Sequence, residues 1–391
     1  GQTMAYHPHG DAAIYEALVN IGIRGFLLET QGNFGNMFTG DPAAAARYIE
    51  TRLSPLALEV LFNPAITKYI PSYDGRNQEP ITLPAKIPLT LLLGAEGIAV
   101  GMSTKVLPHN FVELIEAEIA ILEDRPFEVL PDFPTGGIMD ASEYDGGNGK
   151  IKLRAKIEVR DPKTLVIHDI CYGTTTESLI HSIDEAAKRG KLKIDSISDY
   201  STEKVEIEIK LPRGQYADDV LDHLYHYTEC QVNLIPQMIL IKDDLPAELR
   251  TADILRHHVS LLLSYLKAEL EIEESGYLQA IFEKTLEQIF IENRLYKHIE
   301  EVKSSEEMYE TLEKSIKPFH HLLARLPEHA DYERLLAIPI RRIARFDINK
   351  NQDDIQALDK KLTKTRGHLK KLNAYAITYL KSLITKFGAK F

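Results

Sequence analysis

The sequence predicts a multidomain α+β protein that ends in long paired helices, and three observations carry this prediction. The length of 391 residues suggests two or three domains. Apolar and polar residues alternate in segments between residues 131 and 212, which is typical of strands. From Thr251 onward, apolar residues recur every three or four positions, which is typical of helices. A hydrophobic content of 44% excludes a disordered or collagen-like chain.

The first 110 residues are expected to form short elements separated by Gly, Pro and Asn. Asp11 is expected to cap a helix from Ala12 to about Ile21. Asp41 and Pro42 form a cap-and-first-turn pair, which predicts a helical turn over residues 43–46.

The next stretch alternates extended and helical signals. Residues 47–53 mix β-branched and polar side chains and are expected to be extended, which places Tyr48 on or beside a strand. Ser54 and Pro55 are expected to begin a helix that runs to about Phe62. Residues 84–108 hold several Pro and Gly and are expected to be loop-rich.

The middle of the chain predicts an antiparallel sheet with one face toward water. Strands are expected at 151–159, 165–170 and 205–211, with an amphipathic helix at 177–189 between them.

The C-terminal region predicts an antiparallel helix pair. Apolar residues from Ile355 to Leu383 follow a heptad for about four repeats, which is typical of a coiled-coil strand. Two long helices would then carry a compact helical head at about 303–346. The head is either a cap on the pair or a dimer contact, and the pattern alone does not decide between them.

Composition excludes several classes of protein. The longest apolar runs are far shorter than the ~20 residues of a membrane-spanning helix, and no signal peptide is visible. The two cysteines, Cys171 and Cys230, exclude a disulfide scaffold and are expected to be buried apolar side chains. A net charge of −12 argues against a general polyanion binder, but residues 341–391 hold 13 Lys/Arg and only 4 Asp/Glu.

Familiar catalytic motifs are absent from the sequence. There is no P-loop, GxGxxG fingerprint, nucleophile elbow or HExxH, so an ATPase, a dehydrogenase or a metalloprotease has no support. No carboxylate cluster at DxD spacing follows a strand. A divalent metal, if the chemistry needs one, is therefore expected to take its ligands from a partner protein.

Histidines offer one candidate site. His7 and His9 form a His-x-His pair close to Asp11, which suits either a metal ion or a phosphate at a helix N-terminus. The residues alone leave both interpretations open. His109 is expected to be structural, and the pairs 257–258 and 320–321 are expected to be solvated or packed on helices.

Arg47 and Tyr48 form the second candidate site. Tyrosine is a poor nucleophile near neutral pH, because its usual pKa is about 10. It becomes effective when cations stabilise the developing charge, and Arg47 and Arg52 lie close in sequence. With 18 tyrosines in the chain, a purely structural Tyr48 is the alternative.

Several long motifs resemble one known family. These are YHPHGDAAIYEAL (6–18), QGNFGN (31–36), DPAAAARYIETRLSPLA (41–57), EGIAVGMSTKVLPHN (96–110) and PDFPTGG (131–137). In this order and spacing they are similar to the A subunit of bacterial type IIA DNA topoisomerases, which include DNA gyrase and topoisomerase IV. YDGRNQEP (73–80) and LPAKIP (83–88) look more like topoisomerase IV, and DNA gyrase is the alternative.

The resemblance implies three domains. Residues 1–110 would be a winged-helix domain for DNA binding and cleavage, without the family's usual N-terminal helices. Residues 111–245 would be an α/β tower domain. Residues 246–391 would be a long antiparallel coiled coil, whose head at about 303–346 is the dimerising C-gate.

The resemblance also implies roles for individual residues. Tyr48 stands at the family's active-site tyrosine, which forms a transient 5′-phosphotyrosyl bond with DNA. Arg47 matches the arginine that stabilises charge on the reacting phosphate, and His7 and His9 match histidines at the cleavage site. Ile98 matches the side chain that wedges between base pairs. Further DNA contacts are expected from these residues: Arg52, Gln31, Asn33 and Lys86.

Cofactors and partners follow from the same resemblance. A B subunit would hold the catalytic Mg²⁺ and would bind and hydrolyse ATP, and two A and two B subunits would form the whole enzyme, A2B2. The resemblance places this enzyme in the bacterial cytoplasm, associated with the nucleoid. Its expected partner is double-stranded DNA, and no contact with a membrane is expected.

One departure from the family pattern concerns drug sensitivity. The family usually has Ser or Thr where this chain has Ala12, while Glu16 keeps the acidic residue that follows. In the family these two side chains anchor the water shell of the metal ion bound by fluoroquinolones. Weak fluoroquinolone poisoning is therefore expected.

Two other interpretations compete with a strand-passage enzyme. One is a non-catalytic DNA-clamping scaffold with a winged-helix module and a coiled-coil arm. The other is a histidine-based metal hydrolase, which predicts stoichiometric metal in the isolated chain.

Overall fold

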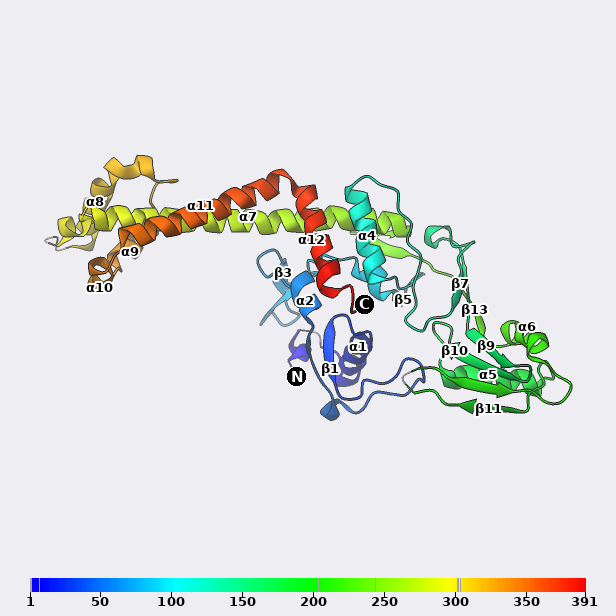
Figure 1. Cartoon of the computed structure of the whole chain (residues 1–391). Helices are drawn as coiled ribbons and strands as arrows, with labels where there is room; N and C mark the ends of the chain where they lie inside the picture. The colour runs from blue at the N-terminus through cyan, green and yellow to red at the C-terminus, as the bar shows by residue number, and fades with distance from the viewer. Residues whose placement is uncertain (1, 7, 203, 243, 301, 303) are drawn as a thin grey trace. The chain divides into compact units, whose positions relative to one another are not determined.

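The computed structural model describes residues 2–6, 8–202, 204–242, 244–300, 302 and 304–391. The chain forms two compact units, one made of residues 1–262 and 377–391 and the other of Leu263–Ala376. Small sheets and helices make up the first unit, and helices make up the second (Figure 1). The predicted mixture of α and β structure is confirmed at this level.

The helices are α1 (Asp11–Ile23), α2 (Pro55–Val60), α3 (Leu89–Leu93), α4 (Phe111–Leu122), α5 (Thr176–Lys188), α6 (Ala217–Tyr227), α7 (Thr251–Glu292), α8 (Ser305–Ile316), α9 (His329–Leu336), α10 (Ile340–Ala344), α11 (Ile348–Lys370) and α12 (Leu372–Phe387). Short 3-10 turns lie at Thr3–Ala5, Ala46–Tyr48, Asp145–Gly147, Leu295–Ile299 and Lys317–Leu322. Within the described residues, no helix is both long enough and apolar enough to cross a membrane.

The strands are β1 (Leu28–Gln31), β2 (Glu50–Leu53), β3 (Tyr69–Pro71), β4 (Gln78–Pro80), β5 (Ala95–Ala99), β6 (Met102–Val106), β7 (Ile138–Asp140), β8 (Ile151–Arg154), β9 (Lys156–Asp161), β10 (Thr164–Asp169), β11 (Ser196–Asp199), β12 (Ile207–Lys210), β13 (Gln231–Leu234), β14 (Ile239–Lys242) and β15 (Leu245–Glu248). All pairs are antiparallel: four two-stranded pairs, a three-stranded sheet of order β13-β8-β7 and a four-stranded sheet of order β11-β12-β10-β9.

Two helix starts test the capping residues that were predicted from the sequence. The Ser54 hydroxyl accepts a hydrogen bond from the Ala57 amide at 3.0 Å, which confirms the predicted start of α2, although the helix ends at Val60 rather than Phe62. Asp11 was expected to be a cap, and this is wrong. Gly10 holds the cap position, and Asp11 is the first helical residue, where its charge suits the helix N-terminus.

The predicted helical turn at 43–46 is also wrong. The turn lies later, at Ala46–Tyr48, and Asp41 does not cap it. Instead, the Asp41 carboxylate accepts a hydrogen bond from the Thr39 hydroxyl at 2.6 Å, and the Asp41 carbonyl accepts one from the Asn36 amide at 3.1 Å. These contacts close a turn over residues 36–41, so Asp41 takes part in this turn instead of capping a helix.

Residues 84–108 are more regular than their Pro and Gly content suggests. They contain α3 and the β5–β6 hairpin, so the loop-rich prediction is wrong for most of this stretch. The two hairpin strands are joined by Val100 and Gly101, and Gly101 has a φ of +74°. Glycine thus makes a tight turn here instead of disrupting the strands.

The middle of the chain confirms most of the predicted sheet. Ile207 and Ile209 of β12 are buried, while Arg160 pairs with Glu206 and Glu208 on the other side, so one face of the four-stranded sheet is polar. The predicted strand 151–159 is in fact β8 and β9, which belong to different sheets. The break falls at Ala155, whose amide donates to the Cys230 carbonyl at 2.8 Å.

Both cysteines are buried beside this break, as expected. Burial raises the pKa of Cys171 to about 11 and that of Cys230 to about 12. They are structural side chains in the core of the first unit.

The second unit contains an antiparallel helix pair. Lys284 of α7 contacts Asp354 of α11 at 2.8 Å, and Glu274 contacts Arg366 at 2.6 Å. Residues nearer the N-terminus of α7 therefore contact residues nearer the C-terminus of α11. The two helices are antiparallel, as the sequence predicts. The second predicted long helix is broken at Lys371, between α11 and α12, where ψ changes to 51°.

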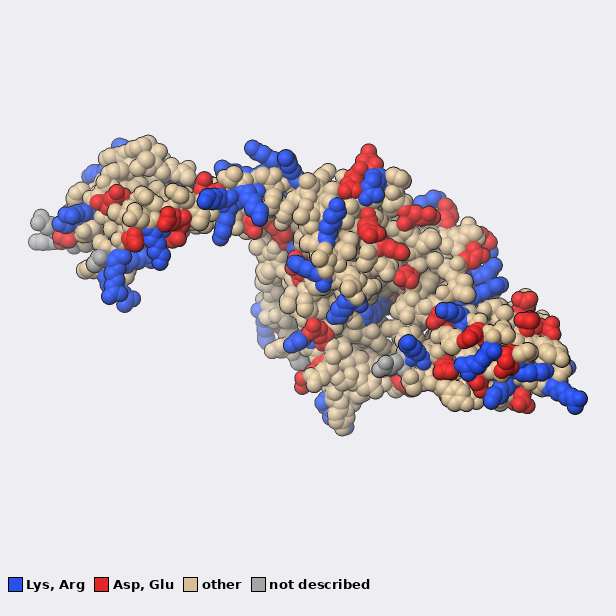
Figure 2. All heavy atoms as spheres, viewed as in Figure 1, with Lys and Arg blue, Asp and Glu red and all other residues tan. Residues whose placement is uncertain are grey.

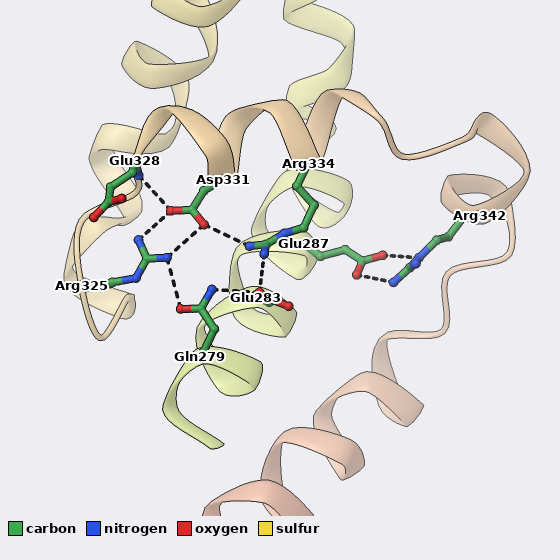
Figure 3. Close-up of polar contacts among 8 residues, drawn as sticks. All are labelled: Gln279, Glu283, Glu287, Arg325, Glu328, Asp331, Arg334 and Arg342. Atoms are coloured by element: carbon green, nitrogen blue, oxygen red, sulfur yellow. Dashed lines mark hydrogen bonds and ion pairs between the residues drawn. The ribbon is translucent and has the colours of Figure 1, made fainter. Parts of the chain in front are cut away.

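A charged network holds the head of the second unit against α7 (Figure 3). Asp331 is buried, and it accepts from Arg325 at 2.6 Å and from Arg334 at 3.1 Å. Burial alone would raise the pKa of Asp331, but these partners outweigh burial and lower it. Arg334 continues to Glu283 of α7, and Arg342 makes two 2.6 Å bonds to Glu287. The Arg342 pair is bidentate, so it also fixes the orientation of α10.

A buried ion pair joins α4 to the start of α7 within the first unit. The Glu118 side chain is fully buried, and its carboxylate contacts the His258 ring, whose other nitrogen lies 3.1 Å from the Ala85 carbonyl. Burial lowers the pKa of His258, but Glu118 and the Ala85 carbonyl outweigh burial and raise it above the ordinary value. The stability from this pair is fully present below the unfolded histidine pKa of about 6.5. It is lost as pH rises through the higher folded pKa.

Replacing Glu118 with Gln tests this pair. We expect the free energy of unfolding to fall by about 1–3 kcal/mol near pH 6 and by less near pH 9, because the parent loses the charged histidine at high pH. Urea unfolding at both pH values measures the change. Glu143→Gln is the control, because Glu143 pairs with Lys150 on the surface, where such pairs contribute about 0–1 kcal/mol. Equal losses for Glu118→Gln at both pH values would contradict the prediction.

Candidate functional site

Tyr48 has an exposed side chain, and its backbone is held by hydrogen bonds. Its side chain is 63% exposed at the end of the Ala46–Tyr48 turn, and the strand β2 begins shortly after it at Glu50. The Tyr48 amide donates to the Ala45 carbonyl at 2.8 Å. The prediction that Tyr48 lies beside a strand is confirmed, but the prediction that residues 47–53 are extended is wrong for Arg47 and Tyr48, which belong to the turn.

The loop before Tyr48 is anchored from two other segments. The Ala44 amide donates to the Asn33 carbonyl at 2.9 Å, and the Tyr15 hydroxyl of α1 donates to the Ala44 carbonyl. Gly32 lies against the Tyr48 backbone, because a Cβ at Gly32 would come within 2.6 Å of the Tyr48 carbonyl oxygen. The Gly32 φ of +98° also favours glycine. Neither Tyr15 nor Gly32 was recognised as a site residue from the sequence.

Arg47 places a positive charge beside the Tyr48 ring. The guanidinium carbon lies 4.7 Å from the ring centroid, within the range of a cation–π contact. Arg52 behaves differently. It lies opposite Glu29 in the β1–β2 pair and contacts that carboxylate at 2.6 Å, while its side chain stays 82% exposed. Arg47 is thus the arginine that the structure brings to Tyr48.

Ile98 lies on the β5–β6 hairpin and is 93% exposed. The neighbouring Val100 is 99% exposed. Apolar side chains with this exposure at a hairpin tip have no packing role within the described residues, and they suit insertion into an apolar environment supplied by a partner.

The remaining predicted DNA-contact residues differ in position. Gln31 is exposed at the end of β1, opposite Glu50. The Asn33 side chain is exposed and accepts from the Gly35 amide at 2.8 Å. Lys86 is only 9% exposed, with its amine 5.0 Å from the centroid of the Tyr379 ring. The position of Lys86 does not support a direct DNA contact and indicates a packing role.

The histidines divide into a surface and a core group. His9 is exposed just before the N-terminus of α1, and His7 lies outside the described residues. His109 is buried with a ring nitrogen 3.2 Å from the Leu91 carbonyl, and burial lowers its pKa to about 4, so it is structural as expected. No group of three or more His, Cys, Asp or Glu among the described residues has the arrangement of a metal site.

Ala12 and Glu16 lie one turn apart on α1, and both are exposed. Residues four apart on a helix share a face, so the two side chains present one surface. A hydroxyl at position 12 would point to the same side as the Glu16 carboxylate.

Comparison with known proteins identifies the family. The family of DNA gyrase and topoisomerase IV A subunits matches residues 1–381. The chain therefore belongs to this family of DNA topoisomerase A subunits.

Individual relatives give a finer ranking. The chain is 48% identical over 388 residues to the A subunit of DNA topoisomerase 4 from Borreliella burgdorferi, which covers 99% of this chain and 62% of the relative. It is 39% identical over 284 residues to the A subunit of DNA gyrase from Mycobacterium tuberculosis, covering 65% of this chain and 34% of the relative. The higher identity to a topoisomerase IV protein agrees with the prediction from YDGRNQEP. The matched part of the chain spans about three fifths or less of the length of these relatives.

Replacing Gly32 with Ala tests the backbone contact at Tyr48. We expect the free energy of unfolding to fall by more than the ~1–2 kcal/mol of a left-handed alanine, because the added Cβ also collides with the Tyr48 carbonyl. Urea unfolding measures the loss. Gly75→Ala is the matched control, since Gly75 has a φ of +69° and open space around its Cβ position. The same loss in both variants would mean that this contact does not constrain the site.

Proposed function

We propose that this chain is the DNA breakage–reunion subunit of a type II topoisomerase of the topoisomerase IV kind, acting in the bacterial cytoplasm on double-stranded DNA. The observation that carries the proposal is the exposed Tyr48 with the Arg47 guanidinium beside its ring, in a chain of this family. The reaction would allow one duplex to pass through a double-strand break in another.

The chemistry follows from the side chains. The Tyr48 hydroxyl oxygen attacks a DNA phosphorus, forms a 5′-phosphotyrosyl ester and displaces the 3′ oxygen, which leaves as a hydroxyl after taking a proton. One phosphodiester replaces another, so resealing by the reverse reaction needs no ATP. Arg47 stabilises negative charge on the reacting phosphate, and such preorganised charge is typically the largest contribution to lowering a barrier of this kind. His9 and His7 would bind the phosphate or move the proton.

The exposed hairpin would deform the cleaved duplex. Ile98 inserts between base pairs and kinks the DNA, and the unstacking cost of a few kcal/mol is offset by contact with the bent duplex. Gln31, Asn33 and Arg52 would contact the same duplex through their exposed side chains.

We propose the domain organisation that the family implies. A winged-helix domain would span residues 1–110, a tower domain 111–245, and a coiled coil with a dimerising head 246–391. Leu322, Leu326 and Ile340 are 55%, 65% and 83% exposed on the head. These apolar side chains favour the dimer contact over the simple cap.

A B subunit would complete the enzyme as A2B2. We propose that its acidic residues hold the catalytic Mg²⁺, which supplies charge stabilisation at the scissile phosphate, and that it binds and hydrolyses ATP. The described residues of this chain do not fit a complete metal site of their own.

Covalent capture tests the nucleophile. The chain is mixed with its B subunit, Mg²⁺ and end-labelled duplex DNA, and denaturant then traps protein–DNA adducts. We expect adducts at 5′ ends with the parent and none with Tyr48→Phe, which lacks the attacking oxygen. Tyr73→Phe is the matched control, because Tyr73 is 64% exposed and should leave the adduct yield unchanged.

Two outcomes would reject the assignment. Adducts that persist in Tyr48→Phe would identify another nucleophile. No adducts from the parent, when a longer relative forms them under the same conditions, would leave the clamp interpretation as the better one if the parent still binds duplex DNA.

A second variant tests the drug surface on α1. We expect Ala12→Ser to increase the adducts that a fluoroquinolone stabilises in the presence of the B subunit, because the new hydroxyl lies one turn from Glu16 and helps to anchor the water shell of the drug-bound metal ion. The adduct yield without drug should not change. Ala13→Ser, on the neighbouring exposed position, is the control. Identical drug titrations for Ala12→Ser and the parent would refute the expectation.

A further inference from the structure

The first unit contains a cavity of about 500 Å³ whose wall does not include Tyr48. The wall includes the C-terminal end of α1, the ends of α3 and α4 that face each other in sequence, and the loops at residues 132–135 and 172–175. Small-molecule sites in proteins usually have volumes of about 300–1,000 Å³. The size of the cavity therefore suits a small molecule.

Hydrogen bonds hold these segments in place around the cavity. The Arg24 guanidinium of α1 donates to the Leu93 carbonyl at the end of α3. The Asp132 amide donates to the Pro108 carbonyl at 2.9 Å, and the Asn110 side chain donates to the Asp132 carboxylate at 3.2 Å. The cavity is thus formed by the fold itself, as most small-molecule sites are.

Aromatic rings line the cavity in two groups. The centroids of the Phe133 and Tyr172 rings are 5.1 Å apart. The centroid of the Phe391 ring lies 4.6 Å from that of Phe26 and 5.6 Å from that of Phe111. All five side chains belong to residues of the wall. Aromatic rings attract one another at such separations, so a flat aromatic ligand matches this wall.

The wall of the cavity carries little charge. Among the described residues that line it, Arg24 and Asp132 are the charged ones, and their signs are opposite. The sheet of β11-β12-β10-β9 differs, because Figure 2 shows positive and negative side chains crowded together over it, where Arg160 pairs with Glu206 and Glu208. Since Arg24 and Asp132 already have hydrogen-bond partners, the cavity favours an uncharged ligand.

Two buried polar atoms of the wall have no hydrogen-bond partner among the described residues. They are Nε2 of His109 and Oγ1 of Thr135, which belong to residues that are 3% and 6% exposed. The His109 ring is neutral, because burial lowers its pKa to about 4. Its Nδ1 lies 3.2 Å from the Leu91 carbonyl, which can only accept, so Nδ1 carries the proton and Nε2 is an acceptor.

We propose that this cavity binds an uncharged aromatic molecule that carries a hydrogen-bond donor for Nε2 of His109 and an acceptor for the Thr135 hydroxyl. Its rings would stack on the aromatic wall. Its polar groups would pair with two buried atoms that are costly to leave unpaired. The site is separate from Tyr48, and the proposal does not rest on the proposed function.

Methionine methyl NMR of the full chain tests the site. Met37 lines the cavity, whereas Met308 lies in the second unit. The methionine methyl groups are labelled with ¹³C, Met37→Leu assigns the Met37 signal, and 2-phenylbenzimidazole is titrated in without DNA or a B subunit. We expect a saturable shift of the Met37 signal with a Kd of about 0.1–1 mM, which is typical of a probe of this size, and no shift of Met308.

A matched probe tests the donor. 2-Phenylbenzothiazole has nearly the same shape and keeps a ring nitrogen that can accept, but it lacks the N–H group. It should bind about 3- to 10-fold more weakly, because the hydrogen bond to Nε2 of His109 is lost. Equal affinities of the two probes would overturn the proposal.

A variant of the wall tests the acceptor. Thr135→Val keeps the shape of the side chain and removes the hydroxyl, so it should weaken 2-phenylbenzimidazole binding by about 3- to 10-fold. Thr51→Val is the matched control, because Thr51 lies on β2 outside the cavity wall and its replacement should leave the Kd unchanged. Circular dichroism checks that both variants are folded.

Three further results would overturn the proposal. They are the lack of a saturable shift at Met37, equal shifts at Met37 and Met308, and an unchanged Kd in Thr135→Val. Because the titration contains neither DNA nor a B subunit, its outcome is independent of covalent capture at Tyr48, which tests the catalytic assignment alone.

Discussion

The close approach of Gly32 to the Tyr48 carbonyl is the constraint on which the candidate site depends. It requires a residue without a side chain and with a left-handed backbone at the end of β1. The β1–β2 register then brings residues 28–31 opposite 50–53, and the Asn33 carbonyl and Tyr15 hydroxyl hold Ala44. Tyr48 is exposed because this backbone is fixed from three sides, so its side chain needs no packing partners.

Charge is distributed unevenly in a way that suits this chemistry. The chain is acidic overall, yet it places Arg47 beside Tyr48. Several other charges pair with one another, as in the Arg325–Asp331–Arg334 network and the Arg342–Glu287 pair of the head. Paired charges stabilise or orient elements, whereas unpaired ones on the surface remain available to a partner.

Signals that act within one turn of chain could be predicted from the sequence. Ser54 caps α2, and residues 176–188, 251–292 and 348–370 are helical, because capping and apolar spacing depend on residues three or four apart. The motifs around Tyr48 also indicated the family, since several matched in order. Local signals failed for two reasons. Asp41 bonds within its own turn, to Asn36 and Thr39, instead of capping a helix. Ala155 bonds to the distant Cys230, and one apparent strand is divided there between two sheets.

The sequence by itself determined the class of this protein, the candidate nucleophile and most of the long elements. Only the tertiary structure decided which arginine reaches the Tyr48 ring and that Lys86 is buried. It also decided that Glu118 and His258, which are 140 residues apart in the sequence, form an interior ion pair. The physical reason is that a side chain's environment depends on which segments pair and in what register. Spacing along the chain specifies the periodicity of an element, but it does not specify the neighbours that the folded chain brings to its surface.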